Sequence, residues 1–115
     1  MHELSIALSI VDRVLEKLEE DGGGIVEAVH LRIGAFSGVE KEALDFAFAL
    51  ACEGTALQGS CLIVEDVPLR IYCPVCRAES SPVSRYQLAC PACNTPAERV
   101  TQGKELELKA FEVAA

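Results

Sequence analysis

The chain has 115 residues, half of them apolar, which is enough for one modest hydrophobic core and a small second lobe but not for two ordinary domains. Ten basic and eighteen acidic residues give a net charge of -8, which repels a phosphate backbone, so we expect no nucleic-acid partner. No apolar run is long enough to cross a bilayer, and Asp12 and Arg13 interrupt any signal-type segment, so we expect a cytoplasmic protein with no membrane span.

The amino-terminal third of the chain reads as a helix followed by a strand. An amphipathic helix is predicted for about residues 3–20, because apolar residues recur there at helical spacing, at Leu4, Leu8, Val11, Leu15 and Leu18. The glycines at 22–24 end this helix. Residues 25–33 then alternate as in a half-buried strand, with one face formed by Val29, Leu31 and Ile33 and the other by His30 and Arg32.

A second helix and two further strands follow. The helix is predicted to open at Ser37 or Val39 and to stop at Gly54, with an apolar face formed by Leu44, Ala47, Phe48 and Ala51. Residues 61–67 form a short β-branched run, and residues 106–113 alternate before the end of the chain. We therefore expect an α+β fold in which two helices pack on a three-stranded sheet.

Two cysteine pairs lie between the last two predicted strands. Cys73-Pro-Val-Cys76 and Cys90-Pro-Ala-Cys93 have the spacing that lets four thiolates converge on one tetrahedral ion, as in a zinc ribbon. Such a site has no open position, so its role is to fold its segment rather than to perform catalysis. Residues 71–102 are therefore expected to form an inserted zinc-binding lobe in a domain made of residues 1–70 and 103–115.

Spacing alone leaves other interpretations of these four cysteines open. Iron in a rubredoxin-like site uses the same ligands, and an electron carrier of that kind would be coloured and reversibly reducible. The pairs could also be buried thiols without a metal. Cys52 and Cys61 have no partner at this spacing and are expected in the core or at its edge. His30 is expected at an ordinary, half-exposed position.

The amino terminus is a second candidate metal site. His2 follows the initiator methionine, and because methionine aminopeptidases need a small second residue, the free amine is expected to stay on Met1. The Met1 amine, the His2 amide and the His2 imidazole can close two chelate rings on one ion, and the Glu3 amide is a candidate fourth donor. Four nitrogens in a plane suit Ni(II) or Cu(II). The alternative is a solvated histidine with no role.

Several segments together resemble the HypA/HybF family of hydrogenase nickel-incorporation proteins over essentially the whole chain. They are Met1-His2-Glu3-Leu4-Ser5-Ile6-Ala7, Leu31-Arg32-Ile33-Gly34, Ser37-Gly38-Val39, Ala47-Phe48, Glu53-Gly54-Thr55, the two cysteine pairs and Gly103-Lys104-Glu105-Leu106. The combination of the Met-His-Glu start with the two pairs is highly specific. The resemblance implies a nickel metallochaperone, which exchanges ligands and is not an enzyme.

The resemblance also implies a role for each candidate residue. His2 would be the nickel ligand, with the Met1 amine and the Glu3 amide or side chain beside it, in a nickel-binding domain of residues 1–70 and 103–115. Cys73, Cys76, Cys90 and Cys93 would hold a structural zinc. The implied partners are a HypB-type GTPase and the large subunit of [NiFe] hydrogenase, and some relatives also serve urease.

Other points stay open at the level of sequence. Some relatives supply a further nickel-binding histidine from the zinc lobe, but residues 71–102 contain no histidine, so the fourth nickel donor is undetermined. The client, hydrogenase or urease, and the oligomeric state, monomer or homodimer, are undetermined too. The main alternative function is a zinc-ribbon adaptor in a nucleic-acid or transcription complex, for which Arg77, Arg85 and Tyr86 are a small supply of suitable residues.

Overall fold

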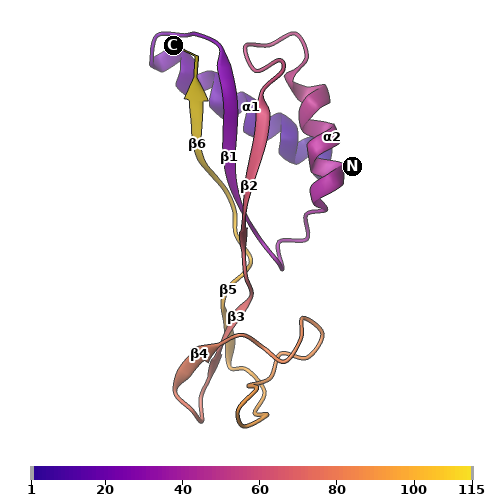
Figure 1. Cartoon of the computed structure of the whole chain (residues 1–115), viewed down its shortest axis with the longest axis vertical. Coiled ribbons are helices and arrows are strands. Elements are labelled where there is room, and N and C mark those ends of the chain that lie inside the picture. Colours follow the sequence, from indigo (N-terminus) through magenta and orange to yellow (C-terminus); the bar gives the residue numbers. More distant parts are fainter. Residues whose placement is uncertain (1, 115) are drawn as a thin grey trace. The chain divides into compact units, whose positions relative to one another are not determined.

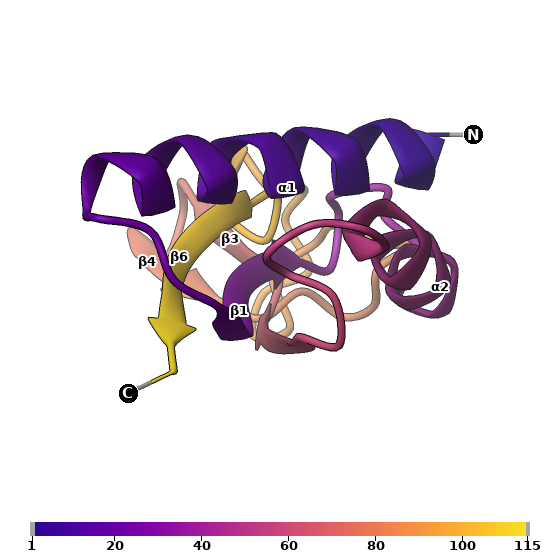
Figure 2. The same ribbon diagram turned by 90° about the horizontal axis from the view of Figure 1, so that it is seen from above.

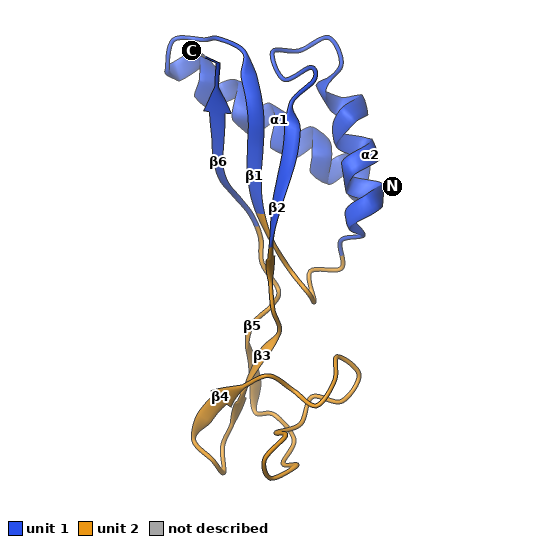
Figure 3. Cartoon of the chain, in the orientation of Figure 1, with its two compact units in different colours: residues 1–31, 39–65, 107–115 blue, residues 32–38, 66–106 orange. Residues whose placement is uncertain are grey.

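The computed structural model describes residues 2–114. The elements follow in the order α1 (His2–Glu20), β1 (Val26–Gly34), α2 (Lys41–Cys52), β2 (Cys61–Val67), β3 (Arg70–Cys73), β4 (Ala78–Ser80), β5 (Arg99–Gln102) and β6 (Leu106–Val113) (Figure 1). They divide into two compact units (Figure 3). Unit 1 consists of residues 1–31, 39–65 and 107–115, and unit 2 consists of residues 32–38 and 66–106.

Unit 1 is built from the two helices and the sheet with strand order β2-β1-β6. Helix α1 crosses one face of this sheet, and α2 packs against α1 (Figures 1 and 2). This arrangement confirms the predicted α+β fold with two helices and a three-stranded sheet. Within residues 2–114, no helix has both the length and the apolarity that a membrane crossing requires.

The buried face of α1 differs from the predicted one. Ala7, Ile10, Val11, Val14 and Leu18 are buried. Leu8, one of the residues on the predicted apolar stripe, is 47% exposed. Apolar residues occupy more than one stripe of this helix, and their periodicity alone does not tell which stripe faces the sheet. The helix ends as expected at the glycines, where the Gly23 amide donates to the Leu18 carbonyl over 2.7 Å.

The start of α2 also differs from the prediction. Strand β1 has the predicted faces, with Val29, Leu31 and Ile33 buried and His30 and Arg32 half-buried. The helix that follows begins at Lys41 rather than at Ser37 or Val39. The reason is that Glu40 has extended backbone angles and acts as the N-cap, its carboxylate accepting a hydrogen bond from the Glu42 amide over 3.2 Å.

Unit 2 contains a second three-stranded antiparallel sheet with strand order β4-β3-β5. These strands were not predicted, because each has only three or four residues and too short a pattern to alternate visibly. Ile71 and Cys73 of β3 are buried, together with Leu69, Ala89 and Cys90. The core of this unit is therefore small and includes two of the candidate metal ligands.

Two glycines bring separate chain segments of unit 2 close together. The Gly34 amide donates to the Glu105 carbonyl over 2.8 Å, and the Phe36 amide donates to the Gly103 carbonyl over 2.6 Å. A Cβ atom on Gly34 would lie 2.1 Å from the Gly103 carbonyl oxygen, so only glycine fits at this position. Unit 2 consequently includes residues 32–38, 66–70 and 103–106 in addition to the segment expected as the zinc lobe.

Candidate metal centre

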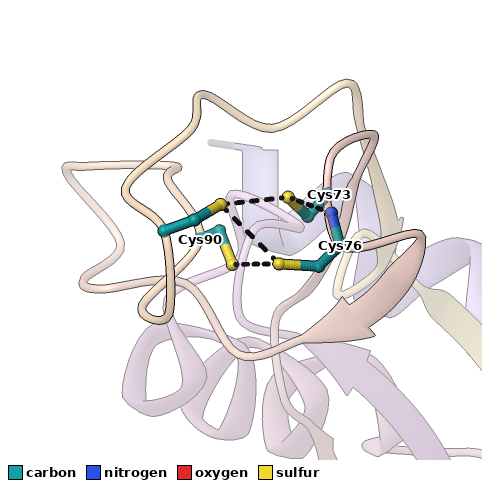
Figure 4. Close-up of side chains that lie close together, drawn as sticks. Cys73, Cys76 and Cys90 are labelled. Atoms are coloured by element: carbon teal, nitrogen blue, oxygen red, sulfur yellow. Dashed lines mark hydrogen bonds between the residues drawn. The ribbon is translucent and has the colours of Figure 1, made fainter.

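The four cysteines of the two pairs meet in unit 2 (Figure 4). The Sγ atoms of Cys73 and Cys93 are 3.5 Å apart. Those of Cys76 and Cys93 are 3.7 Å apart, and those of Cys76 and Cys90 are 3.9 Å apart. All four sulfurs lie within 4.8 Å of one another. Among residues 2–114 this is the only group of three or more histidine, cysteine or acidic side chains placed to hold a metal ion.

Each cysteine pair lies in a backbone turn, and the two turns are of the same type. The Arg77 amide donates to the Cys73 carbonyl over 2.8 Å, and the Asn94 amide donates to the Cys90 carbonyl over 2.7 Å. Arg77 and Asn94 both have positive φ, 54° and 60°, a conformation that side-chain-bearing residues rarely adopt. In the first turn the Cys76 amide also donates to the Cys73 sulfur over 3.3 Å. The repeated turn directs the two sulfurs of each pair to the same side.

The spacing of the sulfurs fits zinc. Ligands about 2.3 Å from one ion at the corners of a tetrahedron lie about 3.8 Å from one another. The three Sγ to Sγ distances of 3.5–3.9 Å bracket that value, and no disulfide joins the cysteines. A zinc ion held by these four thiolates would supply no catalytic chemistry, because no coordination position is left for a substrate. It would cross-link two turns of a unit with a small core.

The electrostatic environment of the four sulfurs is uneven. The Thr95 hydroxyl lies 3.1 Å from the Cys93 sulfur, and its hydrogen bond to the thiolate lowers the pKa of Cys93 to about 6. The adjacent sulfur of Cys93, followed by those of Cys73 and Cys90, raises the pKa of Cys76 to about 12. A bound metal has to displace that proton. Thr95 was missed in the sequence, where its position two residues after the last cysteine was the available signal.

The candidate site at the amino terminus belongs to unit 1. His2 is the first residue of α1 and is exposed. Glu3 follows it in the first helical turn, and its carboxylate accepts a hydrogen bond from the Glu40 amide over 3.1 Å. That bond is the largest cause of a lowered pKa for Glu3. Met1, expected to supply the amine donor, lies outside the described residues.

The remaining candidate residues take no part in either group. Cys52 is buried at the end of α2, as predicted, and burial raises the pKa of its thiol to about 11, which keeps it unreactive. Cys61 is exposed on β2, so its assignment to the core or its edge was wrong. His30 is half-buried and makes a hydrogen bond of 2.5 Å with the Glu112 carboxylate, an ordinary strand position as predicted.

Residues 1–113 match the protein family described as "Hydrogenase/urease nickel incorporation, metallochaperone, hypA". The chain is 47% identical over 112 residues to the hydrogenase maturation factor HypA of Chloroflexus aurantiacus (strain ATCC 29366 / DSM 635 / J-10-fl), covering 97% of this chain and 98% of that protein. It is 36% identical over 112 residues to the hydrogenase maturation factor HybF of Klebsiella pneumoniae, again covering 97% of this chain and 98% of that protein.

Two solved structures have the same fold. The solution structure of a HypA protein superposes with a TM-score of 0.74 at 24% identity, covering 99% of this chain and 97% of that one. The solution structure of the Ni metallochaperone HypA from Helicobacter pylori gives a TM-score of 0.66 at 24% identity, covering 98% and 97%. By the match over residues 1–113 and the identity to its relatives, this chain belongs to the HypA family of nickel metallochaperones and hydrogenase maturation factors, which are not enzymes.

Proposed function

We propose that the chain is a nickel metallochaperone that binds Ni(II) at its amino terminus and delivers it to the large subunit of [NiFe] hydrogenase during maturation. The observation that carries the proposal is the family match from residue 1, which includes the Met1-His2-Glu3 start. In this proposal Ni(II) is cargo. It is bound by the Met1 amine, the His2 amide and the His2 imidazole, with the Glu3 amide completing the set.

Two observations support the amide rather than the carboxylate of Glu3 as the donor. The carboxylate accepts the Glu40 amide and is thus already engaged within unit 1. The first amides of a helix, in contrast, have no carbonyl partner one turn earlier, so metal binding at His2 and Glu3 breaks no backbone-to-backbone hydrogen bond of α1. The exposed position of His2 leaves the imidazole accessible to an incoming ion and to an acceptor protein.

The role proposed for the four cysteines is structural. Cys73, Cys76, Cys90 and Cys93 hold Zn(II), and the observation in favour is the tetrahedral spacing of their sulfurs. The two metals are thereby separated by ligand chemistry. Thiolates in a closed cage retain zinc, whereas nitrogen donors at an open terminus suit an ion that has to be passed on.

Transfer requires that nickel be released. A chaperone of this kind holds its ion with micromolar rather than picomolar affinity, about -8 kcal/mol rather than about -16 kcal/mol. In the proposal a HypB-type GTPase works with the chain in the cytoplasm, and urease maturation proteins are a second class of client. A pull-down from the native cell, followed by identification of the captured large subunit or urease protein, decides between the clients.

Calorimetric titration of nickel tests the central residue. Untagged, zinc-loaded protein at neutral pH should bind one equivalent of nickel, whereas His2→Ala and a variant with extra residues before Met1 should bind none. The variant with the extension is the sharper control, because it keeps every side chain and removes only the terminal amine. Equal nickel binding by all three proteins would place the ion elsewhere and overturn the proposal.

A further inference from the structure

Helix α2 has a second amphipathic face that the fold of unit 1 does not use. Its buried side consists of Leu44, Ala47, Phe48 and Cys52. The opposite side, which we call the outer face of α2, consists of exposed residues at helical spacing: Glu42, Asp45, Phe46, Ala49, Leu50 and Glu53. Figures 1 and 2 both place α2 at the edge of unit 1.

The centre of the outer face is apolar. Phe46 is 70% exposed and Leu50 is 48% exposed, and the two are one helical turn apart, so their side chains are neighbours. Neither residue contributes to the core of the unit. Exposed aromatic side chains with aliphatic neighbours are typical of the centre of protein interfaces, where a partner removes them from water.

The rim of the outer face is acidic. By helical spacing Glu42, Asp45 and Glu53 lie along one flank of the two apolar side chains, and within residues 2–114 neither Asp45 nor Glu53 forms an ion pair or a side-chain hydrogen bond. Glu53 lies at the carboxyl-terminal end of α2, where negative charge opposes the helix dipole, and the last turn contains no basic residue. These two carboxylates therefore do not serve the stability of the helix.

We infer that the outer face of α2 binds a basic amphipathic segment of a partner protein. Apolar side chains of that segment cover Phe46 and Leu50, and its lysine or arginine side chains meet Asp45 and Glu53. Charge decides between the candidate occupants. A second copy of this chain would bring the same carboxylates together at a net charge of -8 per copy, and nucleic acid or an anionic lipid surface would be repelled.

This inference goes beyond the proposed function, because it needs neither nickel nor zinc ligands. The probe for its test is a designed helical peptide with leucines on one face and lysines on both flanks, titrated into the full, zinc-loaded chain. Binding should weaken more than about tenfold in Phe46→Ala. It should weaken several-fold in Asp45→Asn/Glu53→Gln, whose affinity should also depend less on salt. The same peptide with glutamates in place of lysines should not bind.

A control variant with the same loss of charge distinguishes peptide binding at the outer face of α2 from general attraction of the basic peptide to an acidic protein. Glu19→Gln/Glu20→Gln removes two exposed carboxylates from α1 and should leave peptide affinity within about twofold of the wild type. Equal weakening by the α1 and α2 pairs, or unchanged binding in Phe46→Ala, would overturn the inference. A dimer of the wild type, lost in Phe46→Ala, would also overturn it by assigning the face to a second copy.

The nickel proposal and this inference fail separately. Phe46→Ala should bind one equivalent of nickel, as the wild type is proposed to do, because it changes no donor at the amino terminus. A chain that binds the peptide at α2 but no nickel would leave this inference standing without the proposed function. If the chain binds nickel but the α2 substitutions leave peptide affinity unchanged, the proposed function stands and this inference fails.

Discussion

The two units of this chain differ in what holds them together. In unit 1 the two helices and the sheet bury a contiguous set of large side chains, among them Val14, Leu31, Leu44 and Phe48. In unit 2 fewer large apolar side chains are buried, namely Ile33, Val67, Leu69 and Ile71, and its own strands β3, β4 and β5 are three or four residues long. A unit of this size without a larger core needs a cross-link, and the four cysteines supply the ligands for one.

The largest expected effect is the loss of one cysteine of the cluster. Cys90→Ala should prevent unit 2 from folding, because a structural zinc site contributes about 10 kcal/mol or more of folding free energy. Unit 1 should keep its helices, since its core is separate. Amide hydrogen exchange measured residue by residue, with zinc content by elemental analysis, checks both statements. Cys61→Ala is the matched control, because that cysteine is exposed and outside the cluster. Full zinc content and native amide protection in Cys90→Ala would contradict the statement that unit 2 depends on its metal cross-link to fold.

The reverse perturbation should affect unit 1 and spare the zinc. Leu44→Ala removes a fully buried side chain from α2 and should lower the free energy of unfolding by about 2–5 kcal/mol. Urea unfolding followed by circular dichroism measures this loss, and zinc content should stay at one equivalent. Leu50→Ala, on the exposed side of the same helix, should change the stability by less than about 0.5 kcal/mol. If Leu44→Ala released zinc as readily as it destabilised α2, the two units would not be independent.

A smaller effect is expected where backbone segments of unit 2 meet. Gly34→Ala places a Cβ atom 2.1 Å from the Gly103 carbonyl oxygen and should cost about 1–3 kcal/mol, because backbone atoms have to shift. Gly38→Ala meets no atom within 4 Å, but its φ of 81° makes alanine unfavourable by about 1 kcal/mol. Thermal unfolding of the two variants side by side measures the difference. Gly34 itself has no positive φ, so a loss in Gly34→Ala no larger than that in Gly38→Ala would mean that the Gly103 backbone moves aside at little cost and that the close approach does not require glycine at position 34.

The parts of the fold that could be predicted are those with a local signal. The bounds of β2 and β6 follow from their residues, and the two cysteine pairs indicate a common ion by their spacing. The alternation predicted for residues 106–113 was wrong as a guide to burial, because Leu106 and Ala110 are exposed and only Leu108 and Phe111 are half-buried. The start of α2 could not be predicted, because the cap is Glu40 rather than the usual serine, threonine or asparagine. The strands of unit 2 are too short to alternate visibly, and their positions follow from the ligands they bring together.

In the candidate sites, too, features with a local sequence signal could be predicted and features set by nonlocal contacts could not. The sequence identifies His2 and the four cysteines. Of the two turn residues with positive φ, Asn94 is of a type that favours this conformation, but Arg77 carries no such signal. The hydrogen bond from the Glu40 amide to Glu3 joins residues 37 positions apart, and no periodicity reports such a contact. Nonlocal contacts of this kind are set by how α1 and α2 pack, which depends on the complete core.

The smallest expected effect concerns that hydrogen bond. The pKa of Glu3 is lowered from 4.5, first by the Glu40 amide, so the favourable interaction is complete above pH 4.5 and is lost as the pH falls through the lowered value. The proton shift of the Glu40 amide, followed by NMR during acidification, should therefore change with a midpoint below 4.5.

Glu3→Gln separates this bond from other acid effects. Glutamine keeps an acceptor oxygen near the Glu40 amide but has no charge to lose, so the titration of that amide should vanish while α1 and α2 stay folded. Glu16→Gln, on the exposed side of α1, should leave the titration unchanged. A Glu40 amide that titrated at or above pH 4.5, or that still titrated in Glu3→Gln, would show that the first turn of α1 is not joined to the cap of α2. Unit 1 would then rely on apolar packing alone at this end, and its contrast with the cross-linked unit 2 would be sharper.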